Sequence, residues 1–201
     1  MPEIKYYIVD TETTGLRVGW HEITQISIIR CSDRKQLNRY IKAHHPKRVN
    51  PIALEKTGRV YSDLFKGDGR KEVVEFCNNF FAEDGANPEE RCIVGHNIIK
   101  FDKGFLHELW SGEGFEFPAC LWLDTMLYIG AWKKKKGLTT RKSNLNWSLE
   151  ALGITPRPGG HNAVVDTQNN YILWDKLKKE GLPAVPHMKR FAHKLSPEDD
   201  D

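Results

Sequence analysis

The chain has 201 residues, a formal net charge of +3, and 39% hydrophobic and 28% charged residues, which is the composition of a globular domain with a sizeable core. No stretch approaches the roughly 20 consecutive apolar residues of a membrane span, and the segment "MPEIKYYIVD" has no basic stretch leading into a signal-peptide core. These features argue against membrane insertion and secretion, and we expect a cytoplasmic protein with no membrane partner.

The first half of the chain predicts three strands and two helices. Apolar, β-branched and aromatic runs, or runs of alternating polarity, predict strands at 5–12, 22–31 and 36–43. The short links between these runs favour antiparallel pairing. A brief helix is expected at 50–58, and a longer one at 70–82, where apolar residues recur on one face.

The second half alternates strands and helices, which is typical of α/β packing. "RCIVGHN" predicts a short buried strand, "KFDKGFLHELW" predicts a helix, and "LWLDTMLYIGAW" mixes strand and helix. Further helices are expected at "NLNWSLEALGI" and at 162–180. We expect one domain over 1–181 and a C-terminal arm over 182–201, because the last segment carries three prolines and ends in the acidic tail "SPEDDD".

Cysteines and lysines give two further expectations. The four cysteines are far apart and form no C-x-x-C pair, so we expect reduced thiols and no zinc or redox site. The segment "AWKKKKGLTTRK" (131–142) holds six basic residues and no acid. Two interpretations fit this segment: a solvated loop, or a surface for single-stranded nucleic acid in which Lys133 binds phosphate and a base stacks on Trp132.

Two acids, Asp10 and Glu12, stand at the end of an apolar strand in "IVDTETTGL". Side chains alternate along a strand, so both acids project from the same face and repel each other. Exposure to solvent would relieve this repulsion. A divalent cation such as Mg²⁺ or Mn²⁺ would also relieve it, because these ions bind carboxylate oxygens. The pair alone is compatible with both interpretations.

Two more acids stand near the starts of helices. Asp102 lies in the first turns of the helix that follows "VGHN", and Asp166 lies in the first turns of the last helix. Each alone fits a partner of the helix dipole, but strand ends and helix N-termini are also where α/β proteins form their sites. His161 stands five residues before Asp166 and follows two glycines, which suggests a mobile segment. Asp124 is a weaker candidate, and we give it a structural interpretation.

Three motifs occur in a fixed order: "VDTETTGL", "VGHNIIKFDKGFL" and "HNAVVDT". Together they resemble those of the DEDDh 3′→5′ exonucleases, which are related to the proofreading epsilon subunit of bacterial DNA polymerase III. The resemblance covers residues 4–178 and includes "SLEALGI" and "KTGRV". Arg59 and Val60 depart from the smaller apolar pair of the family. Relatives with a catalytic tyrosine place it at the position of Asn162, so His161 identifies the histidine branch.

The resemblance implies a ribonuclease H-like α/β fold: a mixed five-stranded sheet, with three antiparallel strands, two strands parallel to the first, and helices on both faces. It also implies phosphodiester hydrolysis with two Mg²⁺ or Mn²⁺ ions about 4 Å apart. Asp10 would bridge both ions, Glu12 and Asp166 would hold the ion that binds the attacking water, and Asp102 would position the second ion. His161 would take the proton from that water, a task suited to an imidazole.

The resemblance also implies contacts with a nucleic acid that has a free 3′ end. Backbone amides between Thr11 and Gly15 would approach the terminal nucleotide, and Leu16 would wedge against its base. Asn97 would contact the substrate backbone and Phe101 would stack on it, although capping and core packing explain these two residues equally well. The full set of expected substrate contacts is Thr11, Thr13, Gly15, Leu16, Asn97, Phe101, Trp132 and Lys133.

Two other functions stay open at this point. A protein with the same fold but no chemistry would only bind nucleic acid, which we disfavour because all five expected catalytic residues are present. A proofreading subunit would keep the chemistry and act with a separate DNA polymerase or another replication or repair protein, with 182–201 as the docking arm. The sequence does not distinguish DNA from RNA, because a contact with the 2′-hydroxyl has no recognisable motif here.

Overall fold

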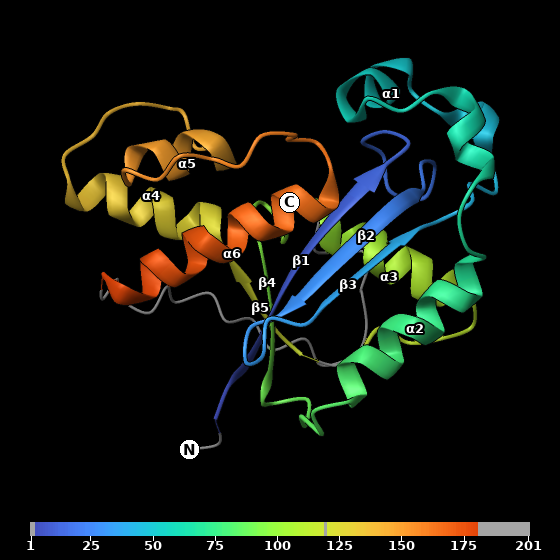
Figure 1. The fold of residues 1–201 in the computed structure, drawn as a ribbon, viewed down its shortest axis with the longest axis horizontal. Helices are drawn as coiled ribbons and strands as arrows, with labels where there is room; N and C mark the ends of the chain where they lie inside the picture. The colour runs from blue at the N-terminus through green and yellow to red at the C-terminus, as the bar shows by residue number, and fades with distance from the viewer. Residues whose placement is uncertain (1–2, 119, 181–201) are drawn as a thin grey trace, which may run out of the picture.

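The computed structural model describes residues 3–118 and 120–180, whose strands form one mixed sheet (Figure 1). The strands are β1 (Lys5–Thr13), β2 (Ile23–Arg30), β3 (Gln36–Tyr40), β4 (Arg91–Gly95) and β5 (Leu121–Asp124). Their order in the sheet is β3-β2-β1-β4-β5. The first three strands pair antiparallel, whereas β4 and β5 run parallel to β1. The sheet expected from the sequence is therefore confirmed, including the direction of each strand.

Helices cover both faces of the sheet (Figure 1). One face packs against α2 (Arg70–Ala82) and α3 (Asp102–Gly112), and the other against α4 (Thr125–Lys135), α5 (Leu145–Ala151) and α6 (Ala163–Lys179). Helix α1 (Pro51–Thr57) and the 3-10 helices η1 (Pro46–Arg48) and η2 (Tyr61–Phe65) connect β3 to α2. None of these described helices is long and apolar enough to cross a membrane.

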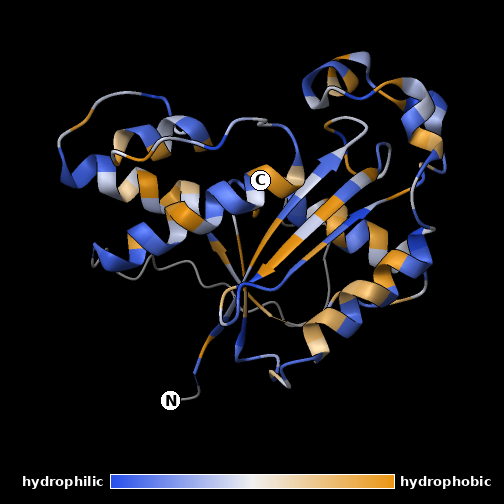
Figure 2. Ribbon diagram, viewed as in Figure 1, coloured by the Kyte–Doolittle hydropathy of each residue, from blue (hydrophilic) through white to orange (hydrophobic). Residues whose placement is uncertain are grey.

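The two faces of β1 contribute to two separate hydrophobic cores, because side chains alternate along a strand. Tyr7 and Val9 belong to the core with α2 and α3, whereas Ile8 belongs to the core with α4, α5 and α6. The strand is hydrophobic in its middle and hydrophilic toward its carboxyl end (Figure 2). Asp10 and Glu12 continue the face of Ile8 and therefore point to the side of the sheet that α6 covers.

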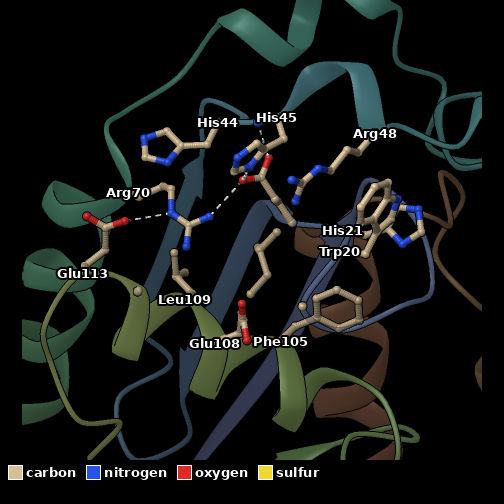
Figure 3. Close-up of a pocket in the computed structure, with 14 residues that line it drawn as sticks. Trp20, His21, His44, His45, Arg48, Arg70, Phe105, Glu108, Leu109 and Glu113 are labelled. Carbon is tan, nitrogen blue, oxygen red and sulfur yellow. Dashed lines mark hydrogen bonds and ion pairs between the residues drawn. The ribbon is translucent and has the colours of Figure 1, made fainter.

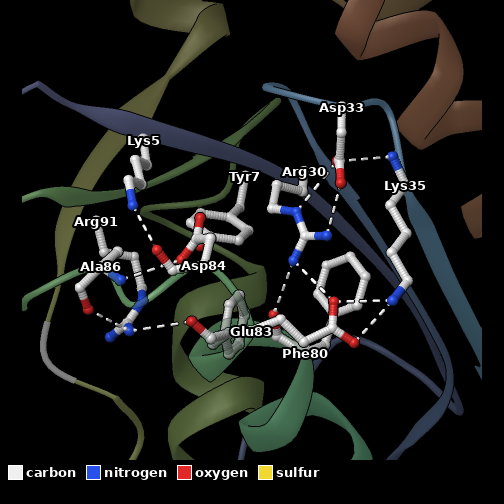
Figure 4. A network of polar contacts seen from close by, with 11 residues as sticks. Lys5, Tyr7, Arg30, Asp33, Lys35, Phe80, Glu83, Asp84, Ala86 and Arg91 are labelled. Carbon is white, nitrogen blue, oxygen red and sulfur yellow. Dashed lines mark hydrogen bonds and ion pairs between the residues drawn. The ribbon is translucent and has the colours of Figure 1, made fainter.

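A polar network ties together the opposite end of the sheet (Figure 4). The buried side chain of Arg30, at the end of β2, forms ion pairs with Asp33 at 2.7 Å and with Glu83 at 2.8 Å. The Tyr7 hydroxyl donates a hydrogen bond to the Asp84 carboxylate. These contacts link β1 and β2 to the segment after α2, so the sheet is cross-linked at the end farthest from Glu12.

The structure changes one expectation and confirms another. The lysine run is not simply a loop, because α4 continues through it and Lys133, Lys134 and Lys135 form the last helical turn. Cations are favourable there because they interact with the negative end of the helix dipole. All four cysteines are free thiols, as expected. The C-terminal arm expected at 182–201 lies outside the described residues.

Candidate metal centre

Three carboxylates converge at the carboxyl end of β1. Oxygen atoms of Asp10, Glu12 and Asp166 all lie within 4.8 Å of one another, and each of these residues is partly buried. Asp10 and Glu12 come from one face of β1, and Asp166 comes from the first turn of α6. The structure therefore brings together three of the four acids selected from the sequence.

The start of α6 is held against the sheet by a hydrogen-bonded amide pair. Asn162 is the N-cap of α6, and its side-chain oxygen accepts a hydrogen bond from the Val164 amide at 3.0 Å. The same oxygen accepts from the side chain of Gln25 at 3.3 Å, and the Gln25 side-chain oxygen accepts from the Ala163 amide at 3.3 Å. Gln25 lies opposite Glu12 on the neighbouring strand β2. This contact fixes the distance between Asp166 and the acids of β1.

Sequence reasoning did not select Gln25. It lies in a strand in which polar and apolar residues alternate, and a polar residue in such a strand is expected to face solvent. The structure instead buries Gln25, which is only 1% exposed. A glutamine within a β-strand next to the acid-bearing strand carries no motif of its own. Only the pairing of Gln25 with Glu12 reveals its position.

Asp102, the fourth acid, is buried at the first position of α3. Its carboxylate accepts a hydrogen bond from the Thr11 hydroxyl at 2.6 Å and another from the Thr11 amide at 3.2 Å. Asp102 is outside the group of three, but its charge raises the pKa of Asp10. The two hydrogen bonds from Thr11 orient the Asp102 carboxylate. This is a correction to the expectation that the Thr11 amide is available to substrate, because Asp102 already occupies that donor.

All four acids have pKa values above those of ordinary carboxyl groups. Burial is the largest cause for each one. Charges on Asp102, Asp166 and Glu12 further raise the pKa of Asp10. The pKa of Glu12 is raised to about 8, although the guanidinium of Arg59 lowers it in part, and that of Asp102 is raised to about 6. The cluster thus carries more negative charge than the protein alone stabilises, which is the electrostatic character of a cation site.

His161 lies beside this cluster, in an exposed turn. Its backbone has a positive φ of 62°, and its amide donates a hydrogen bond to the Asp166 carboxylate at 2.9 Å. A positive charge on its imidazole lowers the pKa of Asp166, so the ring is within electrostatic range of the acids. The structure therefore places His161 next to the carboxylates but leaves its side chain accessible.

The other expected substrate contacts lie in two places: at the end of β1 and the turn after it, and in the segment between β4 and α3. Leu16 is 78% exposed in the turn after β1, as a wedge against a base requires. The Thr13 hydroxyl donates to the Gly15 carbonyl, and an added Cβ at Gly15 would come within 2.4 Å of the His21 ring, so this turn is tightly packed. Asn97 has a positive φ of 69° just after β4. Phe101 packs partly against the core, with its ring centroid 5.1 Å from that of Phe105.

The two expected contacts in the basic segment have different outcomes, because only that of Trp132 needs correction. Trp132 is only 7% exposed and its indole nitrogen is buried, so its ring is not available for stacking with a base. The ammonium of Lys133 donates hydrogen bonds to the carbonyls of Thr140 and Lys142 at 3.2 and 2.9 Å. Lys133 thus fastens the loop after α4 with two of its three ammonium donors, and its contact with phosphate stays a prediction.

Arg59 and Asp124 also have defined places. The half-buried guanidinium of Arg59 donates to the carbonyls of Thr24 and Asp63 at 3.2 and 2.8 Å. Its charge lowers the pKa of Glu12 in part, so Arg59 lies within electrostatic range of that acid. Asp124 caps α4 by accepting the Met126 amide at 2.9 Å, and it also accepts the Asn97 amide at 2.9 Å, which agrees with its structural interpretation.

Comparisons with known proteins agree with this geometry. A family model described as an exonuclease, RNase T, matches residues 7–174. The PolC-type DNA polymerase III of Halalkalibacterium halodurans is 25% identical over 176 residues, which cover 87% of this chain and 11% of that protein. The corresponding protein of Staphylococcus haemolyticus is 22% identical over 200 residues, which cover 99% of this chain and 13% of that protein. The chain therefore spans only a small part of the length of these two relatives.

Solved structures share the fold. The zinc-bound complex of E. coli ExoI with single-stranded DNA superposes with a TM-score of 0.74 at 16% identity, over 89% of this chain and 41% of that chain. A 3′-exonuclease that recognises a histone mRNA stem-loop superposes with a TM-score of 0.71 at 13% identity, over 90% of this chain and 84% of that chain. At these identities the likeness establishes the fold alone.

Proposed function

Because the chain belongs to the RNase T exonuclease family and carries the DEDDh residue pattern, we propose that it is a divalent-metal-dependent 3′→5′ exonuclease. Its products would be nucleoside 5′-monophosphates from DNA or RNA. The observation that carries this proposal is the group of three carboxylates, Asp10, Glu12 and Asp166, with oxygens within 4.8 Å of one another.

The donor set fits hard divalent cations. It consists of carboxylate oxygens only, which suit Mg²⁺ and Mn²⁺, and the raised pKa values indicate charge that needs neutralising. Asp10, Glu12 and Asp166 would hold the ions, and Asp102 lies close enough for its charge to raise the pKa of Asp10. When bound, such ions supply charge neutralisation at the scissile phosphate and a lowered pKa of the attacking water.

The chain itself would supply the base and the position of the strand. His161, exposed beside Asp166, would accept the proton of the attacking water at an imidazole nitrogen. Leu16, exposed after β1, would contact the terminal base and hold the strand end at the acids. A free 3′-hydroxyl suits this site, because a 3′-phosphate would add negative charge beside carboxylates.

The test is a set of degradation time courses on matched single- and double-stranded DNA and RNA, with Mg²⁺ or Mn²⁺ and with EDTA. Strands labelled at the 5′ end should shorten one nucleotide at a time from the 3′ end. A 3′-phosphate should slow cleavage sharply and a 5′-phosphate should not. Shortening from the 5′ end, or equal rates in EDTA, would refute the proposal.

A proofreading subunit is a second candidate, and it is favoured by the similarity to two PolC-type DNA polymerase III proteins. In this case the same hydrolysis would remove nucleotides from a primer end presented by a separate polymerase. Pull-down with the full chain and with a chain lacking 182–201 tests this role. Retention of a polymerase only by the full chain would support it, whereas hydrolysis at the same rate without any partner would favour an independent nuclease.

A further inference from the structure

A cavity of about 150 Å³ lies on the α3 side of the sheet (Figure 3). Its walls come from the loop between β1 and β2, from the segment around η1, and from α3. Ile23, one of its lining residues, pairs with Thr13 at the carboxyl end of β1. Phe105, another lining residue, lies about one helical turn after Asp102. The cavity thus lies toward the carboxyl end of β1, the end that also carries the acids, but on the opposite face of the sheet.

We propose that this cavity is a nucleobase subsite, which binds a base of the substrate strand upstream of the nucleotide that is released. This inference rests on the proposed function, because it assumes that a strand end occupies the acids at the carboxyl end of β1. The subsite would hold the single-stranded part of the substrate while terminal nucleotides are removed in turn.

The mouth of the cavity carries an aromatic ring and a cation. The guanidinium of Arg48 lies 4.3 Å from the centroid of the Trp20 ring, which is 46% exposed (Figure 3). Within the described residues Arg48 has no ion pair, so its charge is available to a phosphate. Aromatic rings with adjacent basic residues are the usual elements of single-strand binding, because bases stack on the ring and phosphates bind the cation.

The size of the cavity and the acidic residue Glu108 in its lining favour a base over a free phosphate. A cavity of about 150 Å³ accommodates a single aromatic ring, which is the scale of a pyrimidine. Glu108, an exposed residue of α3, is one of the lining residues (Figure 3), and its carboxylate has no hydrogen bond or ion pair with any other described side chain. A carboxylate repels phosphate but accepts N–H groups of a base edge. The cavity therefore matches a nucleotide whose phosphate lies at Arg48 and whose base edge faces Glu108.

The remaining wall is already ordered by its own ion pairs. Arg70 donates to Glu22 at 3.1 Å and to Glu113 at 2.8 Å, and the His45 ring lies 3.1 Å from Glu22 (Figure 3). These groups satisfy one another, so binding a base would not require them to rearrange. A preformed wall lowers the entropy lost when a ligand binds.

The test combines an abasic substitution in the strand with substitutions in the protein. Binding of a 5′-fluorescein oligothymidylate of about ten nucleotides is measured by anisotropy in EDTA, which prevents hydrolysis. One abasic residue is moved along the strand from the 3′ end. We expect one upstream position where loss of the base weakens binding to the wild type about 5- to 100-fold.

Protein variants then locate that position. Trp20→Ala should weaken binding of the intact strand by a similar factor and abolish the effect of the abasic residue, whereas Trp20→Phe should retain most of both. Arg48→Met should weaken binding of the intact strand. Lys178→Met is the matched control, because this lysine also lies over aromatic rings but at the far end of α6. Tyr61→Ala tests the alternative that the strand crosses η2.

Hydrolysis assays distinguish a failure of this inference from a failure of the proposed function. Trp20→Ala should leave Mg²⁺-dependent cleavage of a dinucleotide unchanged, because so short a substrate does not reach the cavity. Equal strand binding by Trp20→Ala and wild type, or an effect of Tyr61→Ala in its place, would overturn the subsite while exonuclease activity stood. Binding that depends on Trp20 without any hydrolysis would retain the subsite and refute the nuclease.

Discussion

At the scale of single residues, the proposed metal ligands are the acids of β1 and α6, and the first prediction concerns their charge. We expect Asp10→Asn and Asp166→Asn each to reduce hydrolysis below a few per cent of wild type, because each removes a charged ligand from the group within 4.8 Å. Calorimetric titration with Mn²⁺ should show weakened metal binding. Thermal unfolding in EDTA should be unchanged or shifted upward, because one of several mutually repelling charges is gone.

Asp124→Asn is the control for this prediction. Asp124 is a buried acid at a helix start, but its carboxylate serves as the cap of α4. The substitution should affect stability and leave metal binding intact. If an Asp10 or Asp166 variant kept wild-type activity in Mg²⁺, the assignment of the metal centre would be wrong.

His161 belongs to the residue scale as well, because its proposed task is one proton transfer. We expect His161→Ala to lower kcat by roughly 10² to 10⁴, the usual contribution of a positioned general base, and to leave strand and Mn²⁺ binding nearly intact. An alanine variant as fast as wild type at neutral pH would remove His161 from the mechanism.

The acids could be selected from the sequence because each stands in a motif, whereas their supports could not. Asp10 and Glu12 share a face by the period of a strand, which is a local property. Thr11 orients Asp102 and Gln25 holds Asn162 only after distant segments pack together. Trp132 is an example of a wrong prediction with the same cause. Its position beside a lysine run suggests a stacking surface, but tertiary packing buries the side chain.

At the scale of elements, the site depends on how α6 docks on β2. Strand and helix patterns predicted both elements, but the docking is decided by Gln25, whose side chain bridges Asn162 and Ala163. We expect Gln25→Ala to leave the Ala163 amide buried without a partner, at a cost of about 1–3 kcal/mol. Chemical denaturation should show this loss, and kcat should fall because Asp166 shifts relative to Glu12.

Asn38→Ala provides a matched control for the docking prediction. Asn38 accepts a hydrogen bond from the same Gln25 side chain at 3.0 Å, but it comes from β3, and within the described residues no hydrogen bond joins it to α6. This variant should lose some stability and keep its kcat. Equal losses of kcat in both variants would mean that the strand, and not the docking of α6, controls the site.

At the scale of the whole molecule, the acid cluster should make the stability of the metal-free protein depend on pH. The pKa of Glu12 is raised from 4.5 to about 8, and those of Asp10 and Asp166 are raised as well. An acid with a raised pKa in the folded state contributes stability below its unfolded pKa and loses it as the pH rises through the folded pKa. For Glu12 the loss therefore falls between pH 4.5 and about 8.

Other titratable groups also change the stability of the protein, either in the pH range of Glu12 or outside it. The pKa of Asp33 is lowered to about 2 by Arg30, so its contribution changes only in more acidic solution. Burial lowers the pKa values of His96 and His107, which adds stability as the pH rises and opposes the trend from Glu12. The dependence of total stability on pH thus combines contributions that rise with pH and contributions that fall. A difference between two variants with the same histidines isolates the contribution of the acid.

We therefore expect the Tm of Glu12→Gln in EDTA to exceed that of wild type by an amount that grows from pH 5 to pH 8.5, because glutamine does not ionise. Each kcal/mol corresponds to about 2–4 °C in a domain of this size, so the gap should reach a few degrees. Excess Mg²⁺ should raise the wild-type Tm increasingly with pH, since the ion binds ionised carboxylates, and should reverse the order of the two proteins. Differential scanning fluorimetry across this range measures both effects. A gap that stayed constant with pH, or closed as pH rose, would show that Glu12 is already ionised in the metal-free protein and that the cluster tolerates its own charge without a cation.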